Sequence, residues 1–504
     1  MSVPPSAIPP NALPSLRERY GPNYRWMLLL AVMVGTMASI MSSTVVNVAI
    51  PDMSQHFALG QERAQWVSSG FMAAMTVSML TTPWLLSRFG YRATYSGCMC
   101  LLMAGGLLGG FANAYPLVLA GRVAEGLAAG VVQPIPAIII LRAFEPHEQG
   151  RASGIFGMGV VLAPALGPSV GGLLVDWFGW RSIFFMVVPL CLISLWLAKK
   201  LIPTTGPGGS NGSSAALDWR GLLLAGAGTL CLLNGLVELQ GGTPATASAL
   251  LLAAALVLVA FMWLARRTLR VHKAGQGVEP LLNLELFGDR RFAMGSLVAF
   301  IYGVALFGST YLLPVYMQMG LQLSASTVGT VLLPSGLVLA ITMMGVGRLA
   351  DRYPTHRLIC IGLVLLATSF ALMLLIRLEH AARIIPMLVV WTVIGRIGLG
   401  FVLPSLNIGS MRGLGRDQIP QGVSAINFLR MLGGAAGVSL CGIFLEWRLA
   451  AHGAAPLDHS ATTPGRIAAF DETFLLLAGI CVIAMLAAVR LKPAASLAAP
   501  PERQ

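Results

Sequence analysis

Long apolar runs separated by short polar connections dominate this chain from residue 25 to residue 490. A run of about 20 apolar residues is long enough to cross the hydrocarbon core of a membrane as a helix. The pattern therefore predicts an all-α polytopic membrane protein with fourteen transmembrane helices, of which 219–240 and 246–265 could instead form one long hairpin. The predicted segments are 25–50, 65–87, 93–113, 116–141, 152–175, 182–202, 219–240, 246–265, 292–318, 326–349, 357–377, 384–408, 421–446 and 470–490.

Positive charges fall mainly on alternate connections between these segments. Of the 33 Lys and Arg residues, 24 lie in the tails and even-numbered connections, six lie in odd-numbered connections, and three lie inside segments. Cytoplasmic loops carry an excess of positive charge. We therefore expect a multi-pass protein of the bacterial cytoplasmic (inner) membrane with both termini in the cytoplasm. The bias also supports the count of fourteen, because one missed helix would scramble it.

Composition agrees with a membrane protein. Hydrophobic residues make up 56% of the chain and charged residues 11%, whereas soluble domains carry about 25% charged residues. The net charge of +13 follows from the loop bias, so we expect no nucleic acid partner. The seven cysteines lie in apolar segments without metal-ligand spacing, and we expect neither a metal site nor a cofactor. Membrane lipid is an expected partner.

Two polar turns repeat a similar pattern at distant points of the chain. Ser87-Arg88 follows the second segment and Asp351-Arg352 follows the tenth. The repeat predicts two six-helix halves around an inserted helical pair, an architecture typical of secondary transporters. The expected parts are an N-terminal cytoplasmic tail (1–24), an N-terminal bundle (25–202), a linker with two additional transmembrane helices (203–289), a C-terminal bundle (290–490) and a cytoplasmic tail (491–504).

A cassette of proline and glycine interrupts the fifth segment. Pro164 and Pro168 each remove an internal helix hydrogen bond, and Gly167, Gly171 and Gly172 carry no side chain. Within a membrane such a run is tolerated only as a bent helix packed closely on a neighbour. The cassette therefore predicts a hinge in a moving part.

Several motifs occur in a fixed order, and together they resemble the major facilitator superfamily in its fourteen-helix drug:proton antiporter branch (EmrB/QacA-like). They are Ser42 to Pro51, Arg122 to Gly130, Ala163 to Gly172, Gly179 to Phe185 and Gly347 to Arg357. The resemblance implies a secondary active exporter of amphipathic drugs or related small molecules. It would work by proton antiport and alternating access, and it would confer drug resistance.

The chain departs from this family pattern at informative positions. Ser42 stands where the first-helix motif usually begins with aspartate, and Glu125 where the fourth-helix motif often has glutamine. In the first loop motif, Pro83 and Ser87 replace the usual glycine and aspartate. The loop at about 447–469 is shorter than in some family members that work with periplasmic partners. A periplasmic adaptor protein is thus an open partner.

Proton coupling requires a group that can be protonated inside the membrane. Glu125 is the acidic residue placed deep in a segment, and Arg122 lies three residues before it on the same helical face. A carboxylate screened from water holds its proton more readily. We predict that Glu125 carries the proton and that Arg122 tunes it. The alternative is a fixed structural ion pair.

Two polar stripes in the N-terminal half are expected to face a substrate cavity. Ser39, Ser43 and Asn47 recur every four residues, beside Ser42, and Gln133 returns to nearly the same face as Arg122.

In the C-terminal half, Arg396 and Arg430 lie inside segments without an acidic neighbour, and Asn427 shares a helix face with Arg430. They could line the cavity and favour anionic or zwitterionic substrates, or they could bond one helix to another. Tyr302 and Phe307 are further cavity candidates.

The two repeated turns predict a conformational latch on the cytoplasmic side. The resemblance implies that Asp351, with Arg352, accepts hydrogen bonds from the amino end of a facing helix and pairs with arginine. An ordinary solvated turn is the alternative. The first-half copy, Ser87 with Arg88, carries no carboxylate and should hold more weakly.

Other functions stay open at this point. Ser42 leaves room for an exporter or facilitator of lipids, lipid conjugates or metabolites with atypical or no proton coupling. A membrane enzyme is disfavoured, because the sequence offers no nucleophile–base pair, metal cluster or phosphate loop as a catalytic site. A receptor or scaffold would not need two latches and a bent helix.

Overall fold

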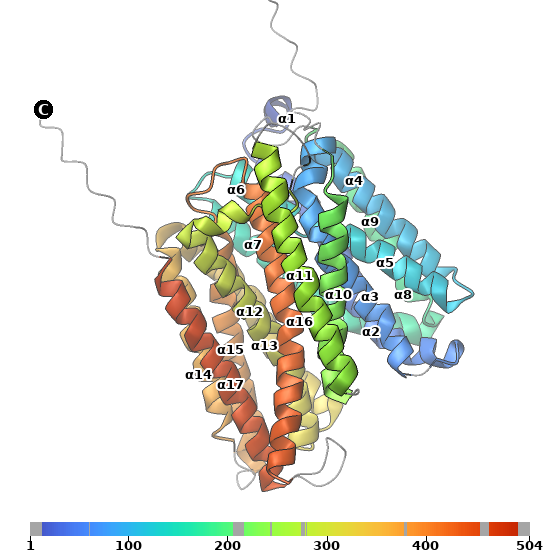
Figure 1. Ribbon diagram of the computed structural model, residues 1–504, viewed down its shortest axis with the longest axis vertical. Helices are drawn as coiled ribbons and strands as arrows, with labels where there is room; N and C mark the ends of the chain where they lie inside the picture. Colours follow the sequence, from blue (N-terminus) through green and yellow to red (C-terminus); the bar gives the residue numbers. More distant parts are fainter. Residues whose placement is uncertain are drawn as a thin grey trace, which may run out of the picture.

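The computed structural model describes residues 13–59, 61–204, 216–241, 244–273, 278, 280–376, 381–453 and 463–491. Almost all of the described chain is helical (Figure 1). The α-helices are α1 Leu13–Tyr20, α2 Tyr24–His56, α3 Gln61–Ser78, α4 Thr82–Gly110, α5 Tyr115–Val132, α6 Ile135–Ala143, α7 Gln149–Phe178, α8 Ser182–Phe185, α9 Val187–Leu201, α10 Trp219–Gly241, α11 Pro244–Lys273, α12 Arg290–Val315, α13 Ala325–Arg352, α14 Thr355–Met373, α15 Ala381–Gly409, α16 Ile419–Ala451 and α17 Pro464–Val489. Short 3₁₀ turns η1 (Met79–Thr81) and η2 (Leu284–Gly288) and a π-helical turn η3 (Tyr316–Gly320) join or extend them.

The predicted all-α membrane fold is confirmed. Twelve helical stretches of the described chain are long and apolar enough to cross a membrane. One of them, Trp66–Gly110, spans 45 residues and contains two predicted segments. It is broken at Gly90, whose φ of 79° and ψ of 174° are not helical. The predicted segment 152–175 lies in the 30-residue helix α7, outside those twelve. The count of fourteen therefore stays a prediction.

Local sequence explains where several helices begin. Asp289 caps α12 by accepting from the amides of Arg291 and Phe292, at 2.7 and 3.1 Å. Asp218 similarly accepts from the amide of Gly221 at the start of α10, at 2.8 Å. Such caps satisfy amides that have no partner inside the helix. Gly90 and Gly179 supply positive φ angles where the chain turns.

The helices pack in two groups that meet along a seam. In the N-terminal part, α2 packs on α7 and α9, and α5 packs on α3 and α4. In the C-terminal part, α12 packs on α16, and α14 packs on α15 and α17. Helix α7 also packs extensively on α13, which joins the two groups. The hairpin of α10 and α11 lies in front of the seam in Figure 1, with α10 against α3 and α16.

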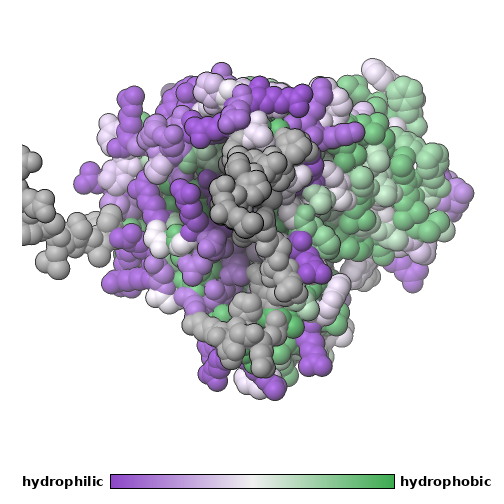
Figure 2. Space-filling view, turned by 90° about the horizontal axis from the view of Figure 1, so that it is seen from above, coloured by the Kyte–Doolittle hydropathy of each residue, from purple (hydrophilic) through white to green (hydrophobic). Residues whose placement is uncertain are grey.

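Polar and apolar surfaces are segregated on the molecule. Figure 2 looks down on the end where α1 lies and shows hydrophilic residues over much of that end. Hydrophobic residues cover the flank on the right of the same view. Many large apolar side chains point outward, among them Trp177, Leu223 and Trp263 at 71%, 70% and 61% exposure. A lipid environment accounts for such exposure, because lipid solvates apolar side chains.

Candidate transport site

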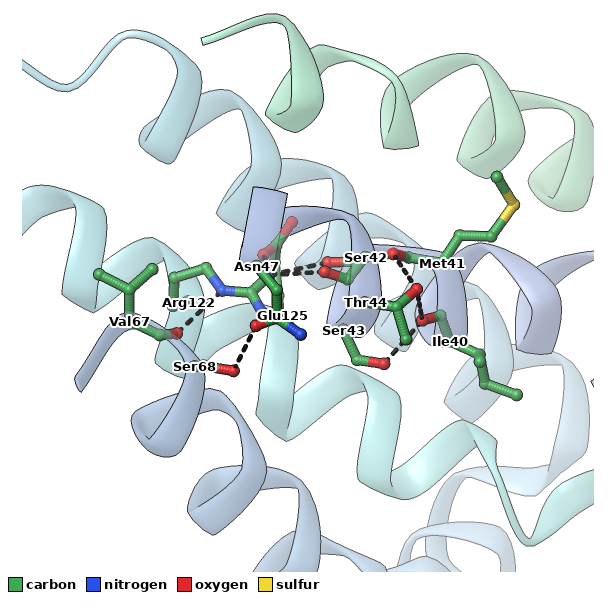
Figure 3. A network of polar contacts seen from close by, with 10 residues as sticks. All are labelled: Ile40, Met41, Ser42, Ser43, Thr44, Asn47, Val67, Ser68, Arg122 and Glu125. Carbon is green, nitrogen blue, oxygen red and sulfur yellow. Dashed lines mark hydrogen bonds and ion pairs between the residues drawn. The ribbon is translucent and has the colours of Figure 1, made fainter. Parts of the chain in front are cut away.

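Arg122 and Glu125 form a buried ion pair on α5 (Figure 3). Nη1 of Arg122 donates to Oε2 of Glu125 at 2.6 Å, and the two side chains are each 1% exposed. The same Nη1 donates to Oγ of Ser42 at 2.9 Å and to the Ser42 carbonyl at 3.2 Å. One guanidinium nitrogen therefore meets both the fourth-helix acid and the first-helix position where the family pattern usually has aspartate.

Helices α3 and α4 enclose this pair. Nε of Arg122 donates to the Val67 carbonyl at 3.2 Å, and the guanidinium carbon lies 4.3 Å from the centre of the Phe71 ring. A Cβ at Gly105 would lie 2.7 Å from Cγ of Glu125, so only glycine leaves room for the acid there. The pair is sealed from water in this conformation.

Two polar atoms of the pair lack a hydrogen-bond partner. They are Oε1 of Glu125 and Nη2 of Arg122, both buried and both without a partner among the described residues. A buried unsatisfied group costs about 1–3 kcal/mol or more when it is charged. The arrangement therefore costs free energy in this conformation, and an opening of the helices that admits water would relieve that cost.

The first-helix polar residues do not share one environment. The hydroxyls of Ser39 and Ser43 are buried and donate to the carbonyls of Thr36 and Ile40 in their own helix, at 2.8 and 2.6 Å. Asn47 is exposed and accepts a hydrogen bond from Ser68 at 3.0 Å. The expected polar stripe therefore lies on α2, but of its three residues only Asn47 is exposed.

A small cavity with a mostly apolar wall and a few polar side chains lies where the two groups of helices meet. Its volume is about 30 Å³, which holds about two water molecules. Gln133, Asn427 and Arg430 are in its wall, together with Thr36 and Asn407. The predicted site residues Gln133, Asn427 and Arg430 are thus brought together. Arg122 shares a face of α5 with Gln133 but lies about 17 Å further along the helix, where Phe71 covers it.

The C-terminal arginines form a second polar group. Nη2 of Arg430 donates to Oδ1 of Asn427 at 2.7 Å. Tyr302 interacts electrostatically with both Arg430 and Arg396. No carboxylate of the described residues pairs with either arginine, and both are partly exposed. Phe307 instead packs against Gly434 in the contact of α12 with α16.

Asp351 reaches across the seam from α13 to the amino end of α7. Its Oδ1 accepts from the amide of Gly150 at 2.6 Å, and its Oδ2 accepts from the amide of Arg151 at 2.9 Å. The helix backbones are close enough that a Cβ at Gly150 would collide with the Gly347 carbonyl. A carboxylate at a helix amino end is favoured by the helix dipole. Arg352 is exposed, and Asp351 bonds to backbone amides rather than to an arginine side chain.

The first-half copy of this turn makes different contacts. The hydroxyl of Ser87 donates to the Trp84 carbonyl of its own helix at 2.9 Å, and Arg88 is exposed. A neighbouring contact crosses the seam instead. Nε and Nη2 of Arg142 both donate to the Arg416 carbonyl, at 3.0 and 2.7 Å.

Sequence reasoning missed the Arg142 contact. Nη1 of Arg142 also reaches the hydroxyl of Tyr91 at 3.2 Å. The partner across the seam is a backbone carbonyl, which no residue pattern identifies. The one available signal is that Arg142 ends the fourth predicted segment on the same side as both repeated turns.

Helix α7 carries the proline and glycine cassette as one helical element through Pro164 and Pro168. Gly167 and Gly171 pack against Thr44 and Val45 of α2, where an added Cβ would crowd those side chains. Gly172 faces open space. The amino end of α7 thus contacts α13 and its carboxyl half contacts α2, so one helix touches both groups.

Two helical groups with twelve apolar helical stretches in the described chain are typical of a multi-pass membrane protein. The model of the Major Facilitator Superfamily matches residues 32–438, and the chain belongs to this superfamily. Its relatives are transporters, so the chain is a transporter rather than an enzyme.

Two relatives of this chain are named as drug-resistance proteins. The chain is 28% identical over 427 residues to the "Multidrug resistance protein B homolog" of Mycobacterium tuberculosis, covering 84% of this chain and 77% of that protein. It is 25% identical over 415 residues to the "Lincomycin resistance protein LmrB" of Listeria innocua, covering 82% and 85%. The fold is also similar to the proton:xylose symporter XylE bound to 6-bromo-6-deoxy-D-glucose. That similarity has a TM-score of 0.62 at 12% identity and covers 92% of this chain and 95% of that one.

Proposed function

We propose that this transporter exports amphipathic drugs or related small molecules by proton antiport, with Glu125 as the proton carrier. The names of two relatives support the substrate class. The fourteen-helix drug:proton antiporter branch is the subfamily we assign. The alternative is an exporter or facilitator of lipids, lipid conjugates or metabolites with atypical or no proton coupling. We favour it less, because Glu125 lies close to Ser42 and can take the role of the missing first-helix aspartate.

One observation carries the proton assignment. Ser42 and Glu125 meet the same nitrogen of Arg122, at 2.9 and 2.6 Å. A carboxylate at either position would face the same guanidinium. We infer that the acid has moved from the first helix to the fourth while its cationic partner stayed in place.

Coupling then follows from the charge balance of a dry site. An ionised Glu125 attracts Arg122 strongly, whereas a protonated Glu125 offers a neutral oxygen. In this proposal, protonation removes the negative charge beside Arg122 and so changes the bonds by which Arg122 holds α5 to α2 and α3, through Ser42 and Val67. Arg122 lies seven residues into α5, about 10 Å from its outer end in the proposed orientation. That depth favours proton entry from outside.

The seam contacts suggest which state this is. Under the proposed orientation, with both termini in the cytoplasm of a bacterial inner membrane, Asp351 and Arg142 close the cytoplasmic side. We therefore assign an outward-facing state or one close to it. The cavity of about 30 Å³ is too small for a drug, so loading requires the halves to part.

The C-terminal arginines set the substrate preference in this proposal. Arg430 places a positive charge in the cavity wall, and Arg396 lies beside Tyr302; neither is paired with a carboxylate among the described residues. Anionic or zwitterionic amphiphiles gain from such a wall. Purely cationic ones would meet repulsion unless bound water or lipid screens it.

The function is tested by transport in proteoliposomes of the purified full chain. A panel of fluorescent amphiphiles is supplied with and without an imposed pH gradient, and internal pH is followed with a trapped dye. We expect transport that accelerates with the gradient and a proton flux opposite to the substrate. Transport that ignores the gradient, without any proton flux, would make the protein a facilitator.

A further inference from the structure

A wide apolar groove lies between α10 and α4, and its lining residues are distinct from those of the small cavity. Its volume is about 910 Å³, near the upper end of typical small-molecule sites. Its walls come from α3, η1, α4, α5 and α10. Three large side chains at its rim are strongly exposed: Leu223 at 70%, Trp219 at 64% and Phe89 at 56%.

The groove runs along α10 for the depth of one membrane leaflet. On α10 its wall extends from Trp219 to Leu230, which is about 17 Å of helix. Half of a hydrocarbon core is about 15 Å. The groove therefore begins at one membrane surface and ends near the midplane. Its length matches that of one lipid acyl chain.

The walls offer almost no hydrogen bonds to an occupant. Ser78, Thr81 and Thr94 line the groove, and each hydroxyl donates to a backbone carbonyl, at 3.1, 2.7 and 2.9 Å. Binding sites for polar solutes usually present a few free polar groups that fix orientation. A hydrocarbon chain is the occupant that requires none.

One exposed arginine, Arg220, lies where the groove begins on α10. Arg220 follows Trp219 and lies on nearly the same face of α10 as the wall residue Ala227, seven positions later. The neighbouring acid, Asp218, is buried and occupied in capping α10.

We propose that this groove binds one anionic phospholipid of the cytoplasmic leaflet, with an acyl chain between α10 and α4 and its phosphate at Arg220. Basic pockets between transmembrane helices on the cytoplasmic side recognise anionic head groups. Trp84 and Trp219 lie at the level expected for interfacial aromatics. The leaflet rests on the orientation proposed above, whereas the groove and its chemistry do not. The lipid acts here as a structural wedge that seats the inserted α10–α11 hairpin on the bundle.

Lipid retention tests the proposal on the full-length protein. The chain is reconstituted in vesicles of equal parts phosphatidylglycerol and phosphatidylethanolamine, extracted in mild detergent, and analysed by native mass spectrometry. We expect one phosphatidylglycerol retained per chain in preference to phosphatidylethanolamine. Arg220→Gln should weaken retention about fivefold, since one arginine near an anionic lipid contributes about 1 kcal/mol.

A second variant fills the groove without disturbing the helix. A Cβ at Gly226 meets Val77 at an ordinary 3.7 Å, so Gly226→Leu should fold and exclude the acyl chain, lowering retention at least fivefold. Matched controls are Arg266→Gln, an exposed arginine late in α11, and Gly336→Leu, a glycine of α13 facing open space. Both controls should retain lipid as the parent does.

Two results would overturn the proposal. One is equal retention of the two lipids by the parent chain. The other is equal loss in Arg220→Gln and Arg266→Gln, which would indicate general charge attraction. Retention does not depend on transport, so loss of proton-driven efflux with retention intact would contradict the proposed function alone.

Discussion

The two halves of this transporter treat buried charge in opposite ways. The N-terminal half holds Arg122 against Glu125 in a sealed site at 1% exposure. The C-terminal half places Arg430 in the wall of the small cavity, where it bonds to the neutral Asn427, and Arg396 beside Tyr302. One half neutralises its arginine with an acid, and the other leaves its arginines positive.

This difference separates two tasks that a coupled transporter must perform. A dry acid–base pair responds to a proton, because protonation changes its net charge. Unpaired, partly exposed arginines respond to a substrate that brings a negative group. We propose that the halves divide proton binding and substrate recognition between them.

The largest effect is expected from removing the acid. Glu125→Gln leaves Arg122 positive without its partner, and loss of one member of a buried pair costs about 3–5 kcal/mol of stability. Gradient-driven efflux should fall to background in proteoliposomes. Thermal unfolding and size-exclusion chromatography check that the variant still folds. Efflux that keeps its gradient dependence in a folded Glu125→Gln protein would assign the pair to structure.

The substrate half is addressed by Arg430→Gln. Loss of a charged hydrogen-bonding group costs about 1.5–3 kcal/mol, so transport of an anionic amphiphile should fall at least tenfold, mainly through a higher KM. Efflux of a cationic dye should change much less. Arg412→Gln, at an exposed position, is the matched control. Equal losses for both substrate charges would remove the recognition role.

The seam contacts offer a second comparison between the halves. Asp351 binds two amides of α7 with a charge, whereas Ser87 bonds to its own helix. Asp351→Asn removes the charge and one of the two acceptors, because an amide NH2 cannot accept from a backbone amide. Turnover should fall at least fivefold, since the charge alone contributes roughly 1 kcal/mol at a helix end. Ser87→Ala should stay within twofold. The measurement is the turnover of each variant at equal surface expression. A larger loss in Ser87→Ala than in Asp351→Asn would show that Ser87, not Asp351, is the stronger latch residue.

The smallest effect is expected at Arg142. It donates two hydrogen bonds to one carbonyl, that of Arg416, and the seam keeps its Asp351 contact without them. Arg142→Gln should therefore lower turnover about two- to threefold. If the Arg142 contact holds the cytoplasmic side closed, a cysteine introduced near the seam should be labelled faster in the variant, because the seam opens more often. Unchanged labelling would show that Arg142 does not contribute to closure.

Much of the fold was readable from the sequence, because apolar run length and arginine placement are direct responses to lipid and water. The runs 25–50 and 421–446, for example, lie within α2 and α16. Glu125 and Arg122 could be paired from spacing alone. Their enclosure could not, because it depends on Phe71 and Gly105 from helices whose rotation no sequence pattern specifies.

The same limit explains other gaps. Asp351 was expected to use an arginine as well as helix amides, yet its bonds here go to amides, which carry no sequence signature. Phe307 was a cavity candidate, but it packs on Gly434. Aromatic residues suit both cavities and helix contacts, so composition does not separate them.

The central claim is that Glu125 replaces the usual first-helix acid opposite Arg122. The most direct test is a double variant, Ser42→Asp with Glu125→Gln, which moves the carboxylate from α5 to the first-helix position. Ser42 already lies 2.9 Å from Nη1 of Arg122, so the account predicts that the double variant regains gradient-driven efflux which Glu125→Gln alone has lost. A folded double variant as inactive as Glu125→Gln, with Ser42→Asp alone fully active, would contradict the claim that the two positions are equivalent proton sites.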